Sequence, residues 1–497
     1  MRLTHLIKIL EANPSIPEAC DFQVRGIACD SKKVGEDFVF VAIKGARADG
    51  HKFIEEAIQR GARFIVVQNS RPAVEEKRGI FSYKDNKKVI FIEVSDTRKA
   101  LADLAARFYD QPSQKLKVIG ITGTNGKTTI SYLLEAILKK ASFSSAVVGT
   151  INYHFKDKII AAKNTTPGPL ELQALLAEML KEKTEYVAME VSSHALDQRR
   201  VEGINFHAAV FTNLTQDHLD YHLTLEEYFL AKAKLFQGLS PGALAIVNND
   251  DPYGRRIRDL TPARFIGYGI DSPAEVMAVD LECDINRTRF KIRTDKQTIT
   301  LESRLIGKHN VYNILAAAAF SLEEGIEVKN IKAAIEDFVL VPGRLERIET
   351  PAGFSVFVDY AHTPDALFNV LTALRNVSSG RLILVFGCGG DRDKTKRAKM
   401  GQVASELADH VFITSDNPRS EAPEAIISDI IKGVKKENYA AVVDRRQAIE
   451  KALGTAREGD IVLLAGKGHE DYQIFKDKTI HFSDQEVVRE CLRALNK

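Results

Sequence analysis

Apolar residues along the chain form short runs that alternate with segments of helical periodicity. The run at 116–119 leads into a glycine-rich turn, and the apolar positions beyond it recur at helical spacing: Ile130, Leu133, Leu134, Ile137 and Leu138. Further strand candidates at 186–191, 208–214 and 243–247 are again separated by helical segments. This alternation predicts an α/β domain with a mainly parallel sheet, whose ligands gather at the carboxyl ends of its strands.

The same pattern predicts a unit on either side of this domain. The first contains strands at 37–43, 63–67 and 89–94, a helix at 53–60 and a helical stretch at 98–109; because the strands are short and apolar, part of their sheet should be covered on both faces. The last restarts as strand and helix, with strands at 354–358, 381–386, 411–414, 440–443 and 461–464. Alternating residues at 287–292 indicate an antiparallel ribbon. A chain of 497 residues suggests about three domains, and we place them at 1–95, 96–340 and 341–497.

Composition narrows the function classes. The 44% hydrophobic content is normal for a globular protein, and a net charge of +2 gives no electrostatic reason to expect nucleic acid as a partner. The five cysteines contain no C-x-x-C pair, which predicts free thiols rather than zinc or disulfides. With neither a signal segment nor 18 continuous apolar residues, we expect a cytoplasmic protein without membrane insertion.

The glycine-rich turn carries the strongest chemical signal in the sequence. Residues 123–129 read Gly-Thr-Asn-Gly-Lys-Thr-Thr between a strand and a helix, where a phosphate would meet unpaired backbone N–H groups. Lys127 would reach the β- and γ-phosphates of a nucleotide, and Thr128 would offer its hydroxyl to Mg²⁺. The strict motif has glycine at 121, whereas this chain has Ile121 and supplies Gly120 one residue earlier.

Polar residues of the central domain follow its strands. Glu190 and His218 each lie just past a strand and could ligate a divalent ion. Lys232 has the pattern of a solvated helix lysine. Asn310 and Asn313 could share one face of a helix that we place at 314–322, although capping is an equally good interpretation of Asn310.

Three polar loops end strands of the last unit, at 359–365, 416–419 and 466–470, and should converge on one crevice. Arg392 and Arg419 could grip carboxylates, while Asp416 and Glu470 could bind an amine, which suits a zwitterionic amino acid. The Asn-Pro-Arg run at 417–419 could also be an ordinary turn with a solvated arginine. The glycine loop at 387–394 is not G-x-G-x-x-G, so it gives little support for a dinucleotide site.

Taken together, the motifs are more specific than any one of them. The phosphate loop is followed by Asn-Thr-Thr-Pro at 164–167, Glu-Val-Ser-Ser-His at 190–194 and Asp-His-Leu-Asp-Tyr-His at 217–222. Then come Gly-x-His-Asn-x-x-Asn at 307–313, Tyr-Ala-His-Thr-Pro-Asp at 360–365 and Gly-Lys-Gly-His-Glu at 466–470. In this order they resemble the Mur ligases over essentially the whole chain. That family implies a uridine-binding N-terminal α/β domain, a central P-loop ATPase and a C-terminal Rossmann-like domain.

The resemblance is closest to the Mur ligases that add the third amino acid to UDP-N-acetylmuramoyl-L-alanyl-D-glutamate, a step in making peptidoglycan precursors. In these enzymes ATP converts the terminal D-glutamyl carboxylate into an acyl phosphate, which the amine of the incoming amino acid attacks. The Asp-Asn-Pro-Arg run at 416–419 is similar to the version that adds meso-2,6-diaminopimelate, because lysine-adding relatives generally lack the arginine. The second carboxylate of diaminopimelate is a fitting partner for Arg419.

The resemblance also implies a role for each matching residue. The groups implied as catalytic are Lys127, Glu190, His218 and Lys232, the last as a CO₂-derived carbamate; Thr128, Glu190, His218 and this carbamate would hold Mg²⁺. The residues implied for ATP are Gly123, Thr124, Asn125, Gly126, Lys127, Thr128, Thr129, Asn310, Asn313, Arg344, His362 and Asp365. Those implied for the UDP-sugar peptide are Cys29, Ser31, Ala46, Arg47, Ala48, Asn164, Thr165, Thr166, Ser192, Gln198 and Arg200. Those implied for diaminopimelate are Arg392, Asp416, Asn417, Pro418, Arg419, Gly466 and Glu470.

One residue departs from common relatives, and three other functions stay open. Lys32 stands where an arginine often follows the Asp-Ser pair of the uridine end. The alternatives are a lysine-adding ligase of the same family, a folylpolyglutamate synthetase-like ligase, which normally lacks the N-terminal unit, and a nucleotide-dependent binding protein without turnover. We expect a monomer whose partners are its small-molecule substrates.

Overall fold

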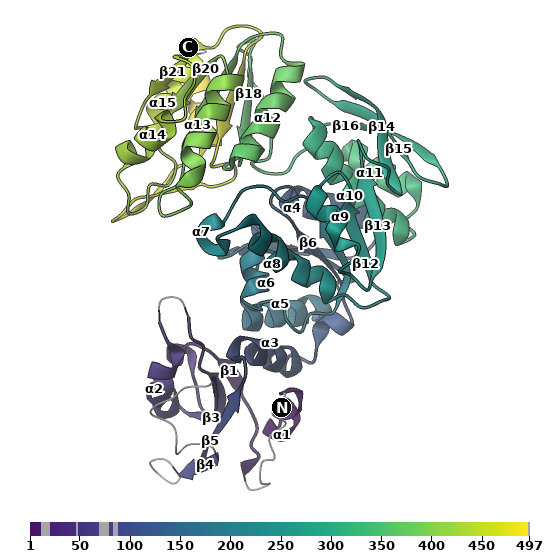
Figure 1. Ribbon diagram of the computed structural model, residues 1–497, viewed down its shortest axis with the longest axis vertical. Coiled ribbons are helices and arrows are strands. Elements are labelled where there is room, and N and C mark those ends of the chain that lie inside the picture. The colour runs from purple at the N-terminus through teal and green to yellow at the C-terminus, as the bar shows by residue number, and fades with distance from the viewer. Residues whose placement is uncertain (11–19, 46–47, 69–78, 83–87, 496–497) are drawn as a thin grey trace. The chain divides into compact units, whose positions relative to one another are not determined.

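The structure is a computed structural model of the 497-residue chain and describes residues 1–10, 20–45, 48–68, 79–82 and 88–495. Figure 1 shows the path of the chain, which divides into two compact units. Unit 1 comprises Met1–Ile119 and Ser144–His207, and unit 2 comprises Gly120–Phe143 and Ala208–Lys497. The division falls inside strand β6 (Lys117–Thr122). The predicted domain bounds at 95 and 340 do not coincide with it and stay predictions.

Unit 1 begins with a five-stranded sheet in the order β1-β2-β3-β5-β4. Its first four strands run parallel, and β4 is antiparallel to β5. The strands are β1 (Gly26–Ala28), β2 (Phe38–Val41), β3 (Ala62–Gln68), β4 (Gly79–Ser82) and β5 (Lys88–Val94). The helices are α1 (Leu3–Leu6), α2 (Ile54–Gln59) and α3 (Thr97–Phe108), with short 3-10 turns at Ile7–Ile9, Ser31–Lys33 and Gly50–Phe53.

Both faces of this sheet are covered, as its apolar strands predict. Phe64 of β3 points to one face, where it shares a core with Leu101 and Leu104 of α3. Ile65, the next residue, points to the other face and packs in a second cluster with Ala57 of α2. Successive side chains of a strand alternate between faces, so a strand that is apolar throughout needs a helix on each side.

The rest of unit 1 continues the α/β pattern. Its strands follow the order β6-β10-β7-β8-β9, in which β10 and β7 are parallel and the last two pairs are antiparallel. The elements are β7 (Ser145–Val148), β8 (Asn152–Phe155), β9 (Lys158–Ala161), α5 (Pro169–Lys181), β10 (Tyr186–Glu190) and α6 (Ser193–Asp197), with a 3-10 turn at Pro112–Gln114. The predicted strand at 186–191 is therefore confirmed, and it ends at Glu190.

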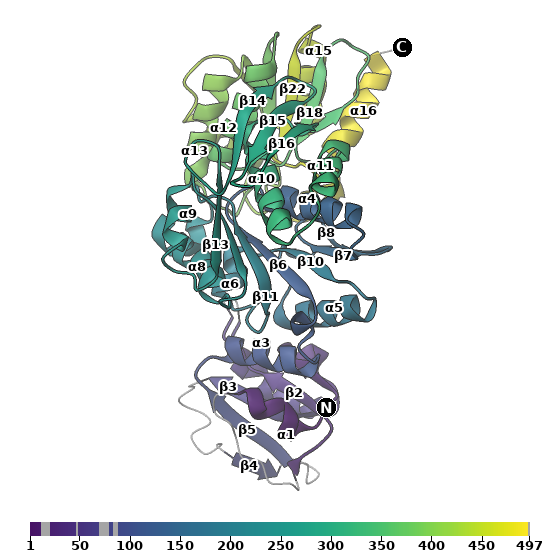
Figure 2. The same ribbon diagram turned by 90° about the vertical axis from the view of Figure 1, so that its right-hand side faces the viewer.

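Unit 2 contains strands in the order β16-β15-β14-β13-β12-β11-β6. Strands β11 to β14 are parallel, while β14, β15 and β16 form an antiparallel ribbon that Figure 2 shows clearly. The predicted ribbon at 287–292 is confirmed. The strands are β11 (Phe206–Phe211), β12 (Leu244–Asn248), β13 (Arg264–Gly269), β14 (Val276–Cys283), β15 (Thr288–Arg293) and β16 (Thr298–Ser303). The helices are α4 (Lys127–Lys140), α7 (Leu219–His222), α8 (Leu225–Gln237), α9 (Pro252–Ile257), α10 (Lys308–Glu323) and α11 (Val328–Asp337).

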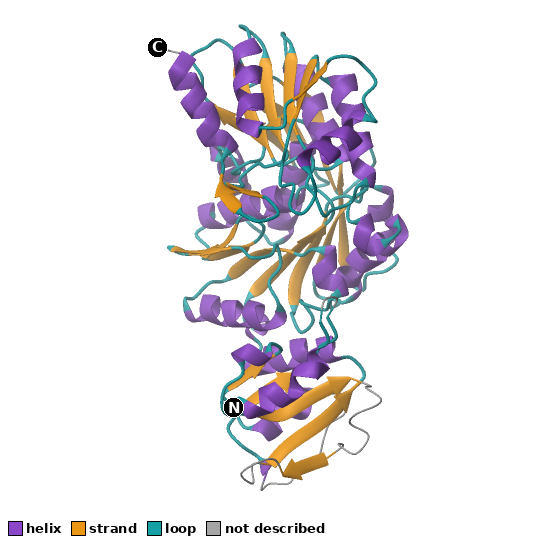
Figure 3. Ribbon diagram, turned by 90° about the vertical axis from the view of Figure 1, so that its left-hand side faces the viewer, coloured by secondary structure: helices purple, strands orange, loops and turns teal. Residues whose placement is uncertain are grey.

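The C-terminal part of unit 2 has its own sheet, in the order β17-β18-β22-β19-β20-β21, with helices on both sides (Figure 3). All its strands except β17 run parallel, as in a Rossmann-like domain. The strands are β17 (Glu346–Ile348), β18 (Ser355–Asp359), β19 (Leu382–Phe386), β20 (His410–Ile413), β21 (Tyr439–Ala441) and β22 (Ile461–Ala465), followed by the hairpin β23 (Tyr472–Ile474) and β24 (Thr479–His481). The helices are α12 (Pro364–Val377), α13 (Thr395–Leu407), α14 (Pro423–Ile431), α15 (Arg445–Thr455) and α16 (Asp484–Leu495).

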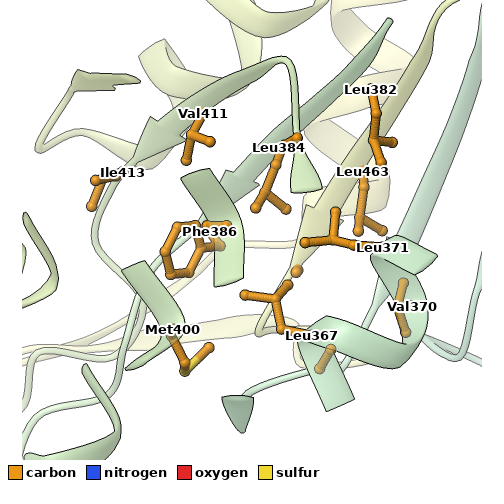
Figure 4. Packing of buried hydrophobic residues seen from close by; sticks show 14 of the residues in the cluster. Leu367, Val370, Leu371, Leu382, Leu384, Phe386, Met400, Val411, Ile413 and Leu463 are labelled. Carbon is orange, nitrogen blue, oxygen red and sulfur yellow. The ribbon is translucent and has the colours of Figure 1, made fainter. Parts of the chain in front are cut away.

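Two apolar layers hold this sheet between its helices. On one face, Leu367 and Leu371 of α12 and Met400 of α13 pack against Leu384 and Phe386 of β19 (Figure 4). The other face, with Val385 of β19, packs against α15 and α16. Each of the strands β18, β19, β20 and β22 ends in a polar loop at the same edge, so the core fixes the loops that carry the candidate site.

The N-cap of α12 offers a test of this part of the fold. Buried Thr363 accepts a hydrogen bond from the backbone N–H of Ala366 at 3.2 Å. Thr363→Ala should lower the free energy of unfolding by about 1 kcal/mol, because a backbone donor of the first turn loses its partner. Urea unfolding measures this change, and Thr363→Ser, which keeps the hydroxyl, is the control. Equal stability of the alanine variant and the parent would contradict the capping role.

Among the described residues, no helix combines the length and the apolar character needed to span a bilayer.

Candidate active site

The turn between β6 and α4 has the geometry of a phosphate loop. Helix α4 begins at Lys127, and its N-cap Gly126 has a φ of +91°, in the left-handed region that favours glycine. A Cβ on Gly126 would overlap the side-chain oxygen of Asn313, and one on Gly123 would overlap the hydroxyl of Thr212. The two glycines of the motif are therefore required by close packing, whereas Ile121 lies in β6, where a side chain fits the core.

The predicted nucleotide residues converge on this turn. Lys127 folds back so that its Nζ donates to the carbonyl oxygens of Gly123 and Thr124 at 2.9 and 2.8 Å. The hydroxyl of Thr128 accepts a hydrogen bond of 3.1 Å from Arg344, whose guanidinium lies over the ring of Tyr360, 4.5 Å from its centroid. Arg344 thus brings a positive charge to the residue predicted to bind Mg²⁺. Thr129 is buried in the first turn of α4.

Asn125 connects the phosphate loop with two other segments of unit 2. Its backbone N–H donates to the side-chain oxygen of Asn213 at 3.0 Å, and its side-chain amide donates to Asp365 at 2.9 Å. Asn369 also donates to the Asp365 carboxylate, and burial raises the pKa of this carboxyl group. Asp365 is therefore already placed at the loop by hydrogen bonds, as its predicted role in nucleotide binding requires.

The structure corrects the interpretation of Asn310. We expected a helix at 314–322 and left open whether Asn310 caps it or shares a face with Asn313, but α10 begins at Lys308 after Gly307, whose φ is +94°. Asn310 lies inside the helix, and its side chain donates to the carbonyl oxygen of Ile306 at 2.9 Å. Asn313 donates to the side-chain oxygen of Asn310 at 3.1 Å, so the prediction that the two share a helical face is confirmed. Asn313 in turn lies against Gly126 of the phosphate loop.

Lys232 is buried, so its interpretation as a solvated helix lysine is wrong. Its side chain is 1% exposed, its Nζ donates to the carbonyl oxygen of Gly123 at 2.8 Å, and the amine lies 4.3 Å from the centroid of the Tyr228 ring. Burial, together with the neighbouring charge of Lys127, holds the pKa of Lys232 well below that of an ordinary lysine. When the pKa of a lysine is lowered, its amine is neutral, and therefore nucleophilic, for a larger fraction of the time than the amine of a solvated lysine.

The residue beside His218 was not in the predicted site. Asp217 is buried, and its carboxylate faces the ring nitrogens of His218 and His362 at 3.5 and 3.9 Å and the ammonium of Lys396 at 3.8 Å. Burial opposes ionisation of Asp217, but the charges of His218 and Lys396 hold its pKa below the usual value. His218 has a φ of +55°, which is strained for a residue other than glycine. The Asp-His pair at 217–218 was the signal that could have identified Asp217.

In unit 1, Glu190 ends β10 with a carboxylate that is held in place. It is 1% exposed, and its two oxygens accept hydrogen bonds of 2.9 Å from the backbone N–H and the hydroxyl of Thr150. Gly149 packs so closely on this carboxylate that a Cβ would overlap it. The orientation of Glu190 is therefore fixed by its neighbours, which is the usual arrangement for a group that must present one oxygen to a ligand.

The central residues predicted for the UDP-sugar peptide form one connected group in unit 1. Arg200 donates to the carbonyl oxygen of Thr166 at 3.0 Å and, through Nε and Nη2, to Gln198 at 3.1 and 2.7 Å. The Thr166 hydroxyl accepts from the backbone N–H of Ser192 at 3.0 Å. Thr165 pairs with the hydroxyl of Thr150, and the carbonyl oxygen of Asn164 accepts a hydrogen bond from Tyr153. Six residues predicted from separate motifs are thus neighbours.

The predicted residues of the N-terminal sheet lie in loops after its strands. Cys29 follows β1 and is exposed, while the Ser31 hydroxyl donates to Glu56 of α2 at 2.8 Å. Ala48 is exposed and its carbonyl oxygen accepts from Gly45. Ala46 and Arg47 lie outside the described residues.

The C-terminal loops also converge. The Asn417 side chain donates to Glu470 at 2.8 Å, and a Cβ on Gly466 would lie 2.8 Å from the Asp416 carboxylate. Arg419, which has a φ of +53°, donates to the carbonyl oxygen of Gly390 at 2.7 Å. The side chains of Arg419 and Arg392 both lie beside Gly389, and the carbonyl oxygen of Pro418 presses against Gly390. Arg392, Arg419, Asp416 and Glu470 therefore lie on three loops that contact one another, at 387–394, 416–419 and 466–470.

Lys467 and Arg445 are buried cations of this region that the predicted site omitted. Lys467 contacts Glu470 and Asn417. Arg445 forms a buried ion pair with Asp484 and also donates to the carbonyl oxygen of Ala465, the residue before Gly466, at 3.1 Å. The lysine inside the Gly-Lys-Gly-His-Glu run was a signal for Lys467, whereas nothing in the sequence singled out Arg445.

The residues predicted to bind Mg²⁺ belong to both units: Thr128 and His218 lie in unit 2, and Glu190 lies in unit 1. No group of three or more His, Cys, Asp or Glu side chains that could hold a metal ion occurs within the described part of the chain. Mg²⁺ usually uses one or two protein carboxylates, several waters and the phosphates of a substrate. The Thr128 hydroxyl in unit 2 and the Glu190 carboxylate in unit 1 are each oxygen donors of the kind that Mg²⁺ uses.

Comparison with known proteins relates these features to one family. Three family models match the chain: "Mur ligase family, catalytic domain" at residues 23–109, "Mur ligase middle domain" at 121–321 and "Mur ligase, glutamate ligase domain" at 343–468. A curated relative from Clostridium botulinum, named UDP-N-acetylmuramoyl-L-alanyl-D-glutamate–2,6-diaminopimelate ligase, is 44% identical over 100% of both chains.

Solved structures of Mur ligases also match the chain. A structure described by the same enzyme name is 31% identical, with a TM-score of 0.69 over 99% of both chains. The MurF ligase of Thermotoga maritima, solved in complex with ADP, shares the fold at 21% identity, with a TM-score of 0.62 over 96% of this chain and 99% of that one. Because the matches run through all three parts of the chain and the phosphate loop lies where the middle-domain model begins, this protein belongs to the Mur ligase family.

Proposed function

We propose that this Mur ligase joins meso-2,6-diaminopimelate to UDP-N-acetylmuramoyl-L-alanyl-D-glutamate at the expense of ATP. ATP would transfer its γ-phosphoryl group to the terminal carboxylate of the D-glutamyl residue, and an amine of diaminopimelate would displace the phosphate to form an amide, with ADP and phosphate released. The observation that carries the proposal is that Arg392 and Arg419 both lie beside Gly389, while the side chain of Asn417, two residues before Arg419, donates to the Glu470 carboxylate. The name of the full-length relative supports it.

The amino-acid end suits a substrate with two ammonium and two carboxylate groups. Arg392 and Arg419 would grip carboxylates, since a guanidinium matches a carboxylate with two parallel hydrogen bonds. Asp416, Asn417 and Glu470 would receive an ammonium group, with Pro418 and Gly466 shaping the backbone around it. L-lysine lacks the second carboxylate, so it would leave one arginine without a partner, and this favours diaminopimelate over a lysine-adding activity.

The nucleotide end would be formed by the phosphate loop and the residues that converge on it. The backbone N–H groups at 123–129 would bind phosphate oxygens at the start of α4, and Lys127 would swing from its loop carbonyls to the β- and γ-phosphates. Arg344, His362, Asp365, Asn310 and Asn313 would complete the ATP site. Thr128, Glu190 and His218 would hold Mg²⁺, whose chemistry there would be to offset the negative charge of the phosphates.

A carbamate on Lys232 would add an anionic ligand for this metal ion. The burial of Lys232 and its lowered pKa support this part of the proposal, because CO₂ reacts with a neutral amine and not with an ammonium. Lys127 would then face an anion instead of another cation. The neighbouring charge that disfavours the ammonium form of Lys232 would thus favour its carbamate.

The UDP-sugar peptide would bind through the connected group in unit 1 and the N-terminal loops. Arg200 and Gln198 support Thr166, and Asn164, Thr165 and Ser192 surround it. Cys29, Ser31 and Ala48 would contact the uridine end, together with Ala46 and Arg47. Lys32 would supply the positive charge that an arginine provides in common relatives.

Incubating the purified protein with ATP, Mg²⁺ and the UDP-dipeptide tests the proposal, with meso-diaminopimelate and L-lysine offered separately. We expect phosphate release and a product of the mass of the diaminopimelate amide, with little turnover of lysine. Preferred use of lysine would establish the lysine-adding alternative. Turnover only with a folate and glutamate would establish a folylpolyglutamate synthetase, an activity that the family match at residues 23–109 disfavours. Nucleotide binding without any product would establish the third alternative, a binding protein without turnover.

The oligomeric state needs its own measurement, and sedimentation would test the expected monomer.

A further inference from the structure

Lys467 is a fully buried lysine beneath the proposed amino-acid site. It follows β22, and its side chain is 0% exposed. Its ammonium donates to the carbonyl oxygen of Tyr472 at 2.6 Å and to Glu470 Oε2 at 3.2 Å, and it lies 3.5 Å from the side-chain oxygen of Asn417. Because these groups enclose it, the ammonium contacts residues of the site and would not contact the substrate itself.

The contacts of Lys467 close a network around two residues that we propose for amino-acid binding. The Asn417 side-chain amide donates to the same Glu470 oxygen at 2.8 Å. The side-chain oxygen of Asn417 accepts from the backbone N–H of Ile474 at 3.0 Å as well as facing Lys467. The donors around this oxygen determine which way the amide points. Glu470, Asn417 and Lys467 therefore hold one another in a single arrangement.

The charges around Glu470 are unequal. The acidic groups near the Glu470 carboxylate are Asp416, Tyr360 and Tyr472, and the cations near it are Lys467 and Arg445. Arg445 is engaged by Asp484 in a bidentate ion pair of 2.8 and 2.6 Å. Burial and the charge of Asp416 raise the pKa of Glu470, whereas Lys467 lowers it. Among the described residues, Lys467 is thus the lysine whose ammonium forms a hydrogen bond with the Glu470 carboxylate.

We propose that Lys467 is a positioning residue for the amino-acid substrate: its buried ammonium holds the Glu470 carboxylate and the Asn417 amide ready to receive an ammonium group of that substrate. This inference rests on the proposed function and extends it to a residue outside the binding surface. It also assigns a role to the buried charge, because an ionised Glu470 attracts the substrate's ammonium and a protonated one does not.

The test is the pH dependence of kcat/KM for diaminopimelate, measured at saturating ATP and UDP-dipeptide. Lys467→Met removes the charge, and Lys467→Gln removes the charge but keeps a hydrogen-bond donor. An opposite charge in contact lowers a carboxyl pKa by ~1–3 units, so both variants should move the acidic limb of the profile upward by about one pH unit or more. At pH values below the acidic limb, kcat/KM of the variants should be about tenfold lower than that of the parent, while their KM for ATP stays near the parental value.

Two further variants separate this role from a merely structural one. Lys478→Met removes a lysine from the exposed turn of the adjacent β23–β24 hairpin and should leave the profile unchanged. In an enzyme that already carries Glu470→Gln, the additional change Lys467→Gln should leave the acidic limb where it is, because the carboxyl group that titrates there is absent. Urea unfolding identifies the variants that fold, and if Lys467→Met does not, Lys467→Gln decides. An unmoved acidic limb in a folded Lys467 variant would overturn the inference, as would equal losses for ATP and diaminopimelate. If the parent enzyme itself does not use diaminopimelate, the proposed function fails first.

Discussion

Replacing Lys232 with alanine should lower turnover by roughly 10²- to 10³-fold, the loss expected when one preorganised charge is removed from a reacting centre. The reason lies in the position of this lysine. Its side chain is buried, its Nζ donates to Gly123 of the phosphate loop, and its pKa lies well below that of an ordinary lysine. A lowered pKa favours the neutral amine that reacts with CO₂, and the proposed carbamate would supply an anionic ligand for Mg²⁺.

Steady-state ADP release measures this loss, and the same helix offers a matched control. Lys234→Ala changes an exposed lysine two residues away on the other side of α8 and should leave the rate near that of the parent. Added formate or acetate should restore part of the activity of Lys232→Ala, because a small carboxylate can take the place of the carbamate. Isotope-labelled bicarbonate should give a carbamate signal in the NMR spectrum of the parent. A Lys232→Ala enzyme that works at the parental rate would rule out this role.

Replacing Arg419 with alanine should raise the KM for diaminopimelate by roughly 30- to 150-fold, while the KM for ATP stays near normal. A charge-assisted bidentate contact to a carboxylate is worth ~2–3 kcal/mol, and each 1.4 kcal/mol corresponds to about a factor of ten. Arg419 is held for this contact by its left-handed backbone and by the hydrogen bond from its guanidinium to Gly390. The loss should be confined to the amino-acid substrate, since the residues that we propose for ATP binding belong to other loops.

Initial-rate measurements with each substrate varied in turn test this second prediction. Arg419→Lys keeps the charge without the fork and should recover only part of the affinity. Arg446→Ala removes an exposed arginine that pairs with Glu490 on the same domain and serves as the control. The preference for diaminopimelate over lysine should also shrink in Arg419→Ala, because the variant loses the partner of the second carboxylate. Unchanged kinetics for diaminopimelate would assign the Asp-Asn-Pro-Arg run to a structural turn.

Several features of the site could be predicted because local residues suffice to define them. The strand, glycine turn and helix at 117–140 follow from an apolar run, two glycines and a helical repeat. Helix boundaries were less predictable. Helix α10 begins before the expected residue 314, because Gly307 ends the preceding segment and the polar first turn hides the start of the helix.

The burial of Lys232 follows in part from the spacing of residues along α8. Tyr228 lies four residues before Lys232 and Leu235 three residues after it, so helical spacing puts all three on one face. The structure buries that face. An apolar face that contains a lysine was thus readable from spacing, but its environment was not, because the neighbouring charge comes from Lys127 on another helix.

The sequence by itself determined the α/β class, the position of the phosphate loop and the polar loops that follow the strands, because periodicity and glycine placement act over a few residues. Only the tertiary structure decided which of these groups meet. Arg344 reaches Thr128 across 216 positions of the chain, and Lys467 lies under Glu470 and Asn417 although the last of these is 50 positions away. Contacts of that kind depend on how sheets and helices pack, and their effect on charge depends on burial. Neither quantity is encoded in a local pattern of residues.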